Sequence, residues 1–124
     1  MMDKKKILII EDEKPIVDVL VKKITEAGFY AISANDGKEG LEKAFGENPD
    51  LVLLDIVLPV MDGMTLLTKL REDEKGKNIP VIILTNLDSG DKVEECRKKG
   101  VYDYLVKTEW SLEEVVEKIK KALS

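Results

Sequence analysis

The chain has 124 residues, of which 44% are hydrophobic and 36% are charged, and its formal net charge is −5. This length suits one domain with one hydrophobic core, and the composition is typical of a soluble globular protein. The acidic balance argues against direct binding of nucleic acid, because phosphate backbones attract basic surfaces. The sequence contains no histidine, which excludes a His-ligated metal, a His-dependent triad and an internal phosphohistidine.

The sequence carries no sign of a membrane or secretory segment. No apolar run approaches the roughly 18 residues of a membrane-spanning helix. The apolar part of the N-terminal stretch is too short for a signal peptide, so we expect a short tail that leads into a strand. Cys96 is the only cysteine, which excludes an internal disulfide and fits a reducing compartment. We therefore expect a cytoplasmic protein with no membrane contact.

Short apolar runs rich in β-branched residues alternate with segments of helical spacing. The runs predict strands over residues 6–10, 30–34, 51–55, 81–85 and 104–107. Between the first two runs, Pro15 lies in the first turn of a predicted helix, and Gly28 is its stop signal. Asn35 or Asp36 can cap a second helix, which we expect to end before Gly46.

Three further helices are predicted in the second half of the chain. The first of them follows Gly63 and carries three leucines at inward positions. The next, near residues 89–99, offers only Val93 and Cys96 as inward candidates. The last begins with a capping box of Ser111 and Glu114 and has a strongly apolar face.

Five strands alternating with five helices imply a parallel sheet that is covered on both faces. Right-handed crossovers then give a doubly wound α/β sandwich of three layers. No linker, repeat or low-complexity segment interrupts this pattern, so we expect residues 1–124 to form one domain.

Polar residues follow four of the predicted strands. Glu11 and Asp12 follow the first strand, Asp55 ends the third, Thr85 ends the fourth and Lys107 ends the fifth. In an open parallel sheet, ligands bind outside the carboxyl ends of the strands. Each residue alone has an ordinary structural explanation, such as a cap or a solvated side chain, but together they predict a single site.

The charges at this predicted site imply a cation. Two carboxylates about 5 Å apart repel by roughly 3 kcal/mol at an effective dielectric of about 20. Lys107 can neutralise only one of the three acids, so a divalent cation is expected as well. Because all available ligands are oxygens, Mg²⁺ or Mn²⁺ is favoured. Asp55 could then be a phosphoryl-accepting nucleophile, with Thr85 and Lys107 stabilising the transferred group.

These residues, taken together, resemble the response-regulator receiver domains, the CheY-like superfamily, and the resemblance covers essentially the whole chain. The motifs are the acidic pair Glu11-Asp12, the D-x-x-x-P-x-x-D-G stretch from Asp55 to Gly63, Thr85, Lys107, and an aromatic residue, Tyr104, three positions before the lysine. The resemblance implies a flavodoxin-like sheet with strand order 2-1-3-4-5.

The resemblance also implies the mechanism of a stand-alone signalling switch that is not an enzyme on other substrates. Asp55 would accept phosphate from a histidine kinase, a phosphotransfer protein or a small phosphodonor. Asp12, Asp55 and the Val57 carbonyl would ligate Mg²⁺, with Glu11 helping through water. Thr85 and Tyr104 would shift inward and change the surface of the fourth helix, fifth strand and fifth helix. That surface would bind a downstream protein, or a second copy of the chain.

The sequence departs from the family pattern at a few positions. Thr108 stands where the family usually has a proline, so we expect a trans bond after Lys107. The rim positions two residues after Asp55 and Thr85 are Val57 and Leu87, and Asn86 lies beside them. Since neither Val57 nor Leu87 can activate a water, we expect slow self-dephosphorylation.

Other functions fit the residues less well. A haloacid-dehalogenase-type phosphatase needs an acid two residues after its nucleophile, where this chain has Val57. A flavin binder needs a phosphate-cradling first loop, but the loop here is acidic. A degenerate receiver that acts only as a docking module is the remaining alternative.

Overall fold

The computed structural model describes residues 4–124, and the expected N-terminal tail lies partly outside this range. The strands are β1 (Lys6–Ile10), β2 (Tyr30–Ala34), β3 (Leu51–Leu54), β4 (Val81–Thr85) and β5 (Asp103–Val106). The helices are α1 (Lys14–Glu26), α2 (Gly37–Gly46), α3 (Gly63–Glu72), α4 (Gly90–Lys98) and α5 (Leu112–Ala122), with a short 3₁₀ helix, η1 (Lys107–Glu109), before α5.

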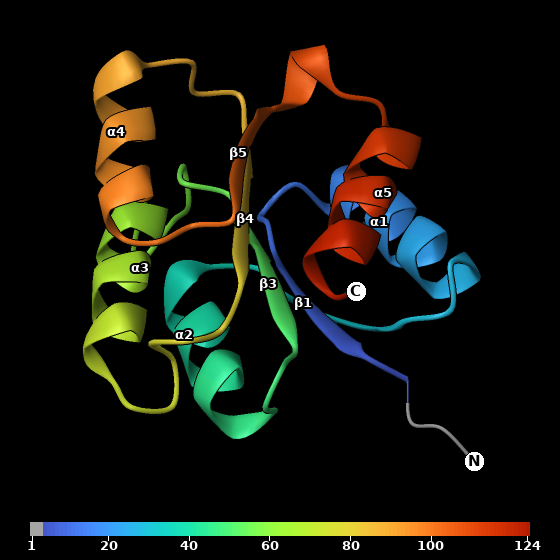
Figure 1. Cartoon of the computed structure of the whole chain (residues 1–124), viewed down its shortest axis with the longest axis horizontal. Helices are drawn as coiled ribbons and strands as arrows, with labels where there is room; N and C mark the ends of the chain where they lie inside the picture. Colours follow the sequence, from blue (N-terminus) through green and yellow to red (C-terminus); the bar gives the residue numbers. More distant parts are fainter. Residues whose placement is uncertain (1–3) are drawn as a thin grey trace.

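All neighbouring strands pair in parallel, in the order β2-β1-β3-β4-β5. Helices α1 and α5 cover one face of the sheet, and α2, α3 and α4 cover the other (Figure 1). The predicted doubly wound sandwich and its strand order are therefore confirmed. None of the helices within residues 4–124 has the length and apolarity that crossing a bilayer requires.

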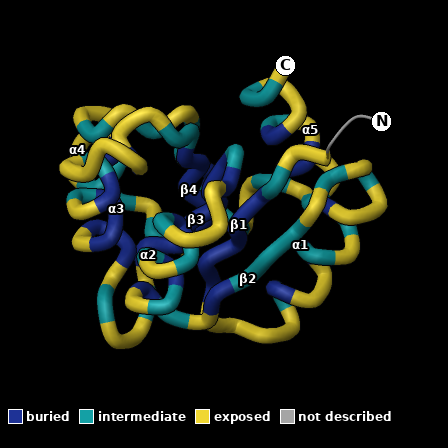
Figure 2. Tube along the Cα trace, turned by 90° about the horizontal axis from the view of Figure 1, so that it is seen from below, coloured by how far each residue is buried: buried dark blue, intermediate teal, exposed yellow. Residues whose placement is uncertain are grey.

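The alternation of side chains along β1 explains the two cores. Leu8 and Ile10 enter the core under α2, α3 and α4, whereas Ile7 and Ile9 enter the core under α1 and α5. Every residue of β3 and β4 is buried, as expected for central strands of a parallel sheet. Figure 2 shows this as a dark blue centre, with exposed yellow segments along the outer helices.

The predicted boundaries are right to within one or two residues. Asp55 lies just after β3 instead of ending it, and Lys107 begins η1 instead of ending β5. Gly46 is the last residue of α2 rather than the first residue after it, because the chain keeps helical geometry up to Glu47. The predicted capping box of Ser111 and Glu114 is present at the start of α5.

Among the five α-helices, α4 has the fewest buried residues. Cys96 is its only buried residue, and the other expected inward residue, Val93, is half-buried. Because burial of apolar surface is the main force that holds a helix on a sheet, α4 is expected to be among the least stable parts of the fold.

Candidate functional site

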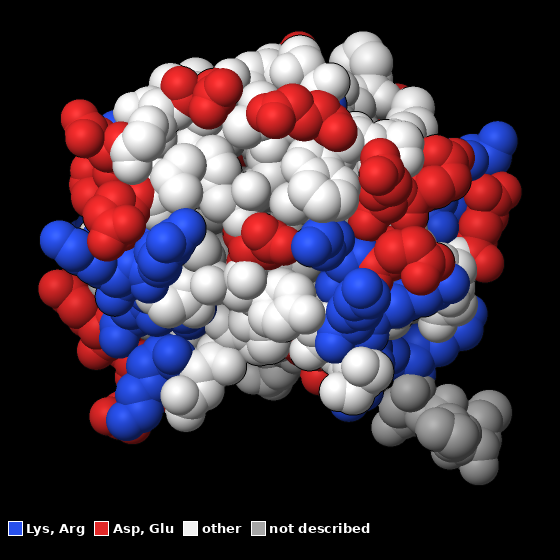
Figure 3. Space-filling view, turned by 45° about the horizontal axis from the view of Figure 1, so that its top comes forward, with Lys and Arg blue, Asp and Glu red and all other residues white. Residues whose placement is uncertain are grey.

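The carboxyl ends of the strands bring the predicted site residues to one edge of the sheet. A pocket of about 210 Å³ opens there. Its lining residues come from two loops and from the end of β4 with the residue after it: Asp12, Glu13, Asp55, Val57, Thr85 and Asn86. In Figure 3, which tilts this edge forward, acidic side chains lie across the upper part of the view, and Lys and Arg lie mostly below them.

Lys107 is the cation at the centre of this site. Its Nζ lies 2.5 Å from Oε1 of Glu11 and 3.0 Å from Oδ2 of Asp55. The carboxylates of Glu11 and Asp55 are only 3% and 5% exposed, and the Lys107 side chain is 11% exposed. A third acid, Glu13, lies 3.6 Å away on the exposed side. One ammonium group therefore faces three carboxylates, two of which are buried.

The pKa values of the two buried partners reflect this crowding. Burial raises the pKa of Glu11, the hydrogen bond from Lys107 opposes that rise, and the nearby Asp55 carboxylate adds to it. Burial lowers the pKa of Lys107, but its hydrogen bonds to Glu11 and Asp55 outweigh this effect and raise it overall. Lys107 is therefore held in its charged form, whereas burial and repulsion by the Asp55 carboxylate disfavour the charged form of Glu11.

Each carboxylate oxygen of Asp55 has one hydrogen-bond donor. Oδ1 accepts from the backbone N–H of Val57 at 3.1 Å, and Oδ2 accepts from Lys107. Behind Asp55, Gly63 packs against its backbone, and a Cβ on Gly63 would lie 2.4 Å from the Asp55 carbonyl oxygen. The side chain thus has a fixed position, with one face open to the pocket.

Thr85 and Tyr104 are linked through the β4–α4 connection. The Thr85 side chain is fully buried, and its Oγ1 accepts from the N–H of Leu87 at 3.3 Å. The hydroxyl of Tyr104 donates to the carbonyl oxygen of Leu87 at 2.5 Å. Burial raises the pKa of Tyr104 to about 12, so this hydroxyl remains a donor at neutral pH. Leu87 therefore bonds to both predicted switch residues through its backbone.

The predicted rim residues occupy different environments. Val57 is 61% exposed, and it lines the pocket together with Asn86. Leu87 instead packs, half-buried, against the core under α2, α3 and α4. The bond between Lys107 and Thr108 is trans, as predicted, since residues 4–124 contain no cis peptide bond.

The acids at this edge are arranged so that they could share a cation. One carboxylate oxygen from each of Glu11, Asp12 and Asp55 lies within 4.8 Å of the others. Asp12 is exposed, whereas the other two are buried, so the cluster opens toward solvent on one side. Carboxylate oxygens are the ligands that Mg²⁺ prefers, and this donor set therefore fits that ion.

Two of the contacts that were not predicted involve Glu13 and the backbone of Leu87. The Glu13 carboxylate approaches the ammonium group of Lys107, and the carbonyl oxygen of Leu87 accepts a hydrogen bond from the hydroxyl of Tyr104. The first had a detectable signal, because Glu13 lies in the same acidic loop as Glu11 and Asp12. The second involves a carbonyl group, which every residue carries, and so had no signal in the sequence.

Comparison with known proteins identifies the family of the chain. The response regulator receiver domain family matches residues 7–120. The alkaline phosphatase synthesis transcriptional regulatory protein PhoP of Bacillus subtilis (strain 168) is 38% identical over 120 residues, which are 96% of this chain. The chain spans only 48% of the length of that relative.

Solved structures show the same fold. A CheY-like response regulator receiver domain protein from Methanospirillum hungatei JF-1 has a TM-score of 0.91 at 30% identity, covering 98% of this chain and 94% of that one. A chain of the CheX–CheY–BeF₃–Mg²⁺ complex from Borrelia burgdorferi has a TM-score of 0.87 at 32% identity, covering 97% and 90%. The chain belongs to the response regulator receiver domain family.

Proposed function

We propose that this chain is the phosphoacceptor switch of a two-component system, located in the cytoplasm, and that Asp55 is the phosphorylated residue. The phosphoryl donor is a histidine kinase, a phosphotransfer protein or a small phosphodonor. The observation that carries this proposal is the position of Asp55, buried beside Lys107 and sharing a pocket with Thr85. The chain acts on no other substrate and catalyses only its own phosphorylation and dephosphorylation.

The arrangement around Asp55 supports phosphoryl transfer. A carboxylate oxygen of Asp55 forms a bond to phosphorus while the phosphorus–nitrogen bond of the donor phosphohistidine breaks; the imidazole nitrogen keeps the bonding electron pair and takes up a proton from solvent. Lys107, which bonds to Oδ2 in the unmodified protein, transfers a hydrogen bond to a phosphoryl oxygen. Thr85 approaches another phosphoryl oxygen with its hydroxyl.

The residues that would hold the cation are Glu11, Asp12, Asp55 and the backbone carbonyl of Val57. When bound, Mg²⁺ would neutralise charge on the transferring phosphoryl oxygens. The carboxylate oxygens of the first three lie close enough to one another to share an ion. Mn²⁺ has the same preference for oxygen ligands and is expected to substitute.

The output surface is assigned to α4, β5 and α5. Phosphorylation would draw the Thr85 hydroxyl toward Asp55 and so disturb its bond to Leu87, which also anchors Tyr104. Since α4 has a single buried residue, little packing opposes its displacement. The changed surface binds a downstream protein, or a second copy of the chain, and does not contact nucleic acid directly. The Borrelia CheY complex with CheX supports a protein partner.

A labelling experiment tests the phosphoacceptor. Incubation with acetyl phosphate and Mg²⁺ should add one phosphoryl group to the wild-type chain and none to Asp55→Asn, as measured by intact-mass spectrometry. Asp62→Asn is the matched control, because Asp62 lies in the same loop but caps α3 from outside the site. This control should be labelled like the wild type.

The outcomes separate the alternatives. Equal labelling of the wild type and Asp55→Asn would refute the assignment of Asp55. Continuous release of phosphate without a stable adduct would favour a phosphatase. If no variant is modified, the chain is a constitutive docking module.

The residues at the rim of the pocket are expected to determine how long Asp55 stays phosphorylated. Hydrolysis of the aspartyl phosphate needs a water in line with the phosphorus–oxygen bond, and Val57, on the pocket wall, cannot orient one. We expect slow decay of the phosphorylated wild type after the donor is removed, and several-fold faster decay for Val57→Asn. Leu87→Glu should act in the same direction but also lose core packing.

Val19→Asn is the control for this decay experiment. Val19 lies on α1, is 42% exposed and does not line the pocket. Its phosphorylated form should decay at the wild-type rate. Equal decay rates for the wild type, Val57→Asn and Leu87→Glu would show that the rim does not control access of water.

A further inference from the structure

The first turn of α2 touches the loop between β3 and α3, which carries Asp55 and Val57. The N–H of Gly37 donates to the carbonyl oxygen of Pro59 at 3.3 Å. A Cβ added to Gly37 would lie 1.7 Å from the Met61 carbonyl oxygen. This contact is with backbone, which cannot rotate away as a flexible side chain could. Only glycine therefore fits at position 37 with the loop in its present place.

The loop segment at this contact has an unfavourable conformation. The Pro59 carbonyl also accepts the N–H of Met61 at 2.8 Å, and Val60 between them has φ 71. This is a γ-turn with positive φ, which is rare, and a β-branched residue in such a conformation costs about 1–3 kcal/mol. Val60 is 77% exposed, so its own packing contributes little to holding the turn.

A strained turn persists only when its surroundings fix it. Toward α3, the N–H of Gly63 bonds to the Ile56 carbonyl oxygen at 2.7 Å and closes the loop. At the apex of the loop, the backbone of Pro59 and Met61 contacts Gly37 of α2, and the Met61 side chain packs against the core. Ile56 directly precedes Val57, whose N–H bonds to Asp55, so a displaced apex shifts the backbone that presents the site.

We propose that Gly37 is a positioning residue for the cation site, although α2 contributes no side chain to the pocket. Gly37 lets α2 approach the apex of the β3–α3 loop and so fixes the Val57 carbonyl and the Asp55 carboxylate relative to each other. This inference rests on the proposed Mg²⁺-dependent function.

Three alanine substitutions on α2 separate positioning from simple destabilisation. Gly37→Ala pushes against the loop backbone. Gly40→Ala pushes against the side chain of Ile10, 2.8 Å from the added Cβ, and so disturbs the core but not the loop. Gly46→Ala meets nothing within 4 Å. Each variant is assayed for its melting temperature and, by isothermal titration calorimetry, for its affinity for Mg²⁺ alone.

The expected pattern is specific to Gly37. Gly46→Ala should bind Mg²⁺ like the wild type, and Gly40→Ala should melt at a lower temperature but keep its Mg²⁺ affinity within about twofold. Gly37→Ala should bind Mg²⁺ at least tenfold more weakly. Gly37→Ala with wild-type affinity, or Gly40→Ala with the same loss, would overturn the inference.

A measurement on the wild type decides the question if Gly37→Ala does not fold. Coupling between two sites is reciprocal, so Mg²⁺ should stabilise the contact that supports its own site. Amide hydrogen exchange of Gly37 should slow on addition of Mg²⁺, while that of Gly46 should not change. Unchanged exchange at Gly37 with Mg²⁺ bound would overturn this inference alone. A wild type that binds no Mg²⁺ would overturn the proposed function and this inference with it.

Discussion

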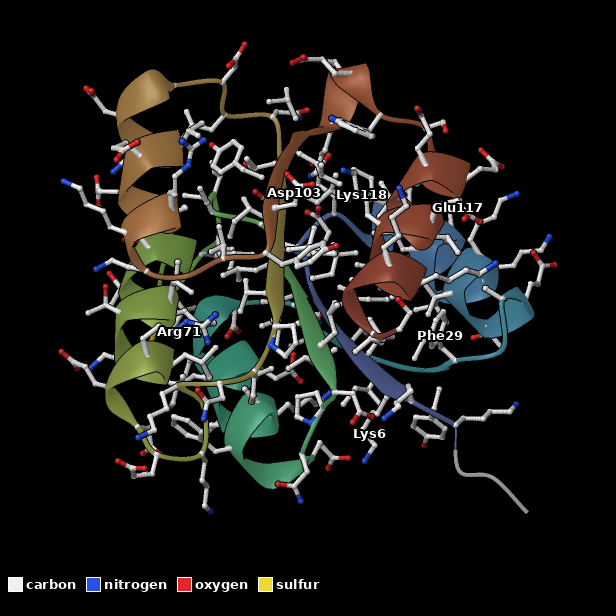
Figure 4. The ribbon with its side chains drawn as sticks, in the orientation of Figure 1. Lys6, Phe29, Arg71, Asp103, Glu117 and Lys118 are labelled. Carbon is white, nitrogen blue, oxygen red and sulfur yellow. The ribbon has the colours of Figure 1, made fainter. Side chains whose placement is uncertain are left out.

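Replacing Arg71 by methionine should lower the free energy of unfolding by about 3 kcal/mol, because its guanidinium makes several charge-assisted hydrogen bonds. Nε donates to the Lys99 carbonyl oxygen at 2.7 Å, and one terminal nitrogen donates to those of Gly76 and Ile79, both at 2.8 Å. The other terminal nitrogen donates to the Gly100 carbonyl oxygen at 3.2 Å. Arg71 thus joins α3 to the segment before β4 and to the end of α4 (Figure 4).

Two properties of this cluster make the loss large. Arg71 is partly buried, and burial lowers its pKa, so its charge depends on the four carbonyl groups for solvation. The carbonyls of Lys99 and Gly100 also lie just beyond the C-terminal end of α4, where a cation interacts favourably with the helix dipole. Removal of the guanidinium therefore loses the hydrogen bonds to the segment before β4 and those to the end of α4 at the same time.

Urea denaturation measures this effect. Lys69→Met, an exposed cation-to-methionine change on the same helix, should cost less than about 0.5 kcal/mol. Arg71→Lys should recover only part of the stability, because one ammonium cannot reach both sets of carbonyls in the planar geometry of a guanidinium. A loss below about 1 kcal/mol for Arg71→Met would show that water replaces its hydrogen bonds.

The Arg71 cluster also shows why the sequence predicts some features of this fold and not others. Alternation of apolar runs and helical segments predicted all five strands and all five α-helices, because burial on two faces of a parallel sheet imposes that pattern, but it did not predict the 3₁₀ helix η1. The partners of Arg71 are carbonyl groups of residues 5 to 29 positions away. Carbonyl groups carry no residue identity, so no pattern of letters could predict the cluster.

The same distinction applies to the site: the sequence pattern predicts which strands deliver residues to it, but not how the side chains pair there. Asp55, Thr85 and Lys107 were predicted to meet because parallel strands deliver their carboxyl ends to one edge. The pairing of Lys107 with Glu11 as well as Asp55 depends on side-chain reach and burial, which the strand pattern does not determine. The close approach of Gly37 to Met61 depends on how α2 lies relative to a loop, which is a tertiary property.

Lys107→Met should be more destabilising than any change to the exposed ion pairs, because it leaves Glu11 and Asp55 buried without their cation. Removing one partner of a buried pair typically costs about 3–5 kcal/mol. We expect a loss of about 3 kcal/mol here, since Glu11 and Asp55 retain backbone hydrogen bonds from Glu13 and Val57. Urea denaturation at neutral pH without metal measures the loss.

Mg²⁺ should restore much of this stability, and this rescue distinguishes a charge effect from lost packing. A metal at 100 times its dissociation constant stabilises by about 2.7 kcal/mol if it binds only the folded state. Lys118→Met is the control. Lys118 pairs with Asp103 at 2.8 Å, but both side chains are more than a quarter exposed (Figure 4), so its loss should be below about 1 kcal/mol.

The decisive comparison is the size of the Mg²⁺ effect in the two variants. Lys118→Met should gain as much stability from Mg²⁺ as the wild type does, because Lys118 is remote from the acidic cluster. Lys107→Met should gain more, because the ion then relieves repulsion that the ammonium relieves in the wild type. An equal or smaller gain of stability in Lys107→Met would mean that Lys107 and Mg²⁺ do not neutralise the same carboxylates. That result would contradict the proposal that Glu11, Asp12 and Asp55 are the ligands of Mg²⁺.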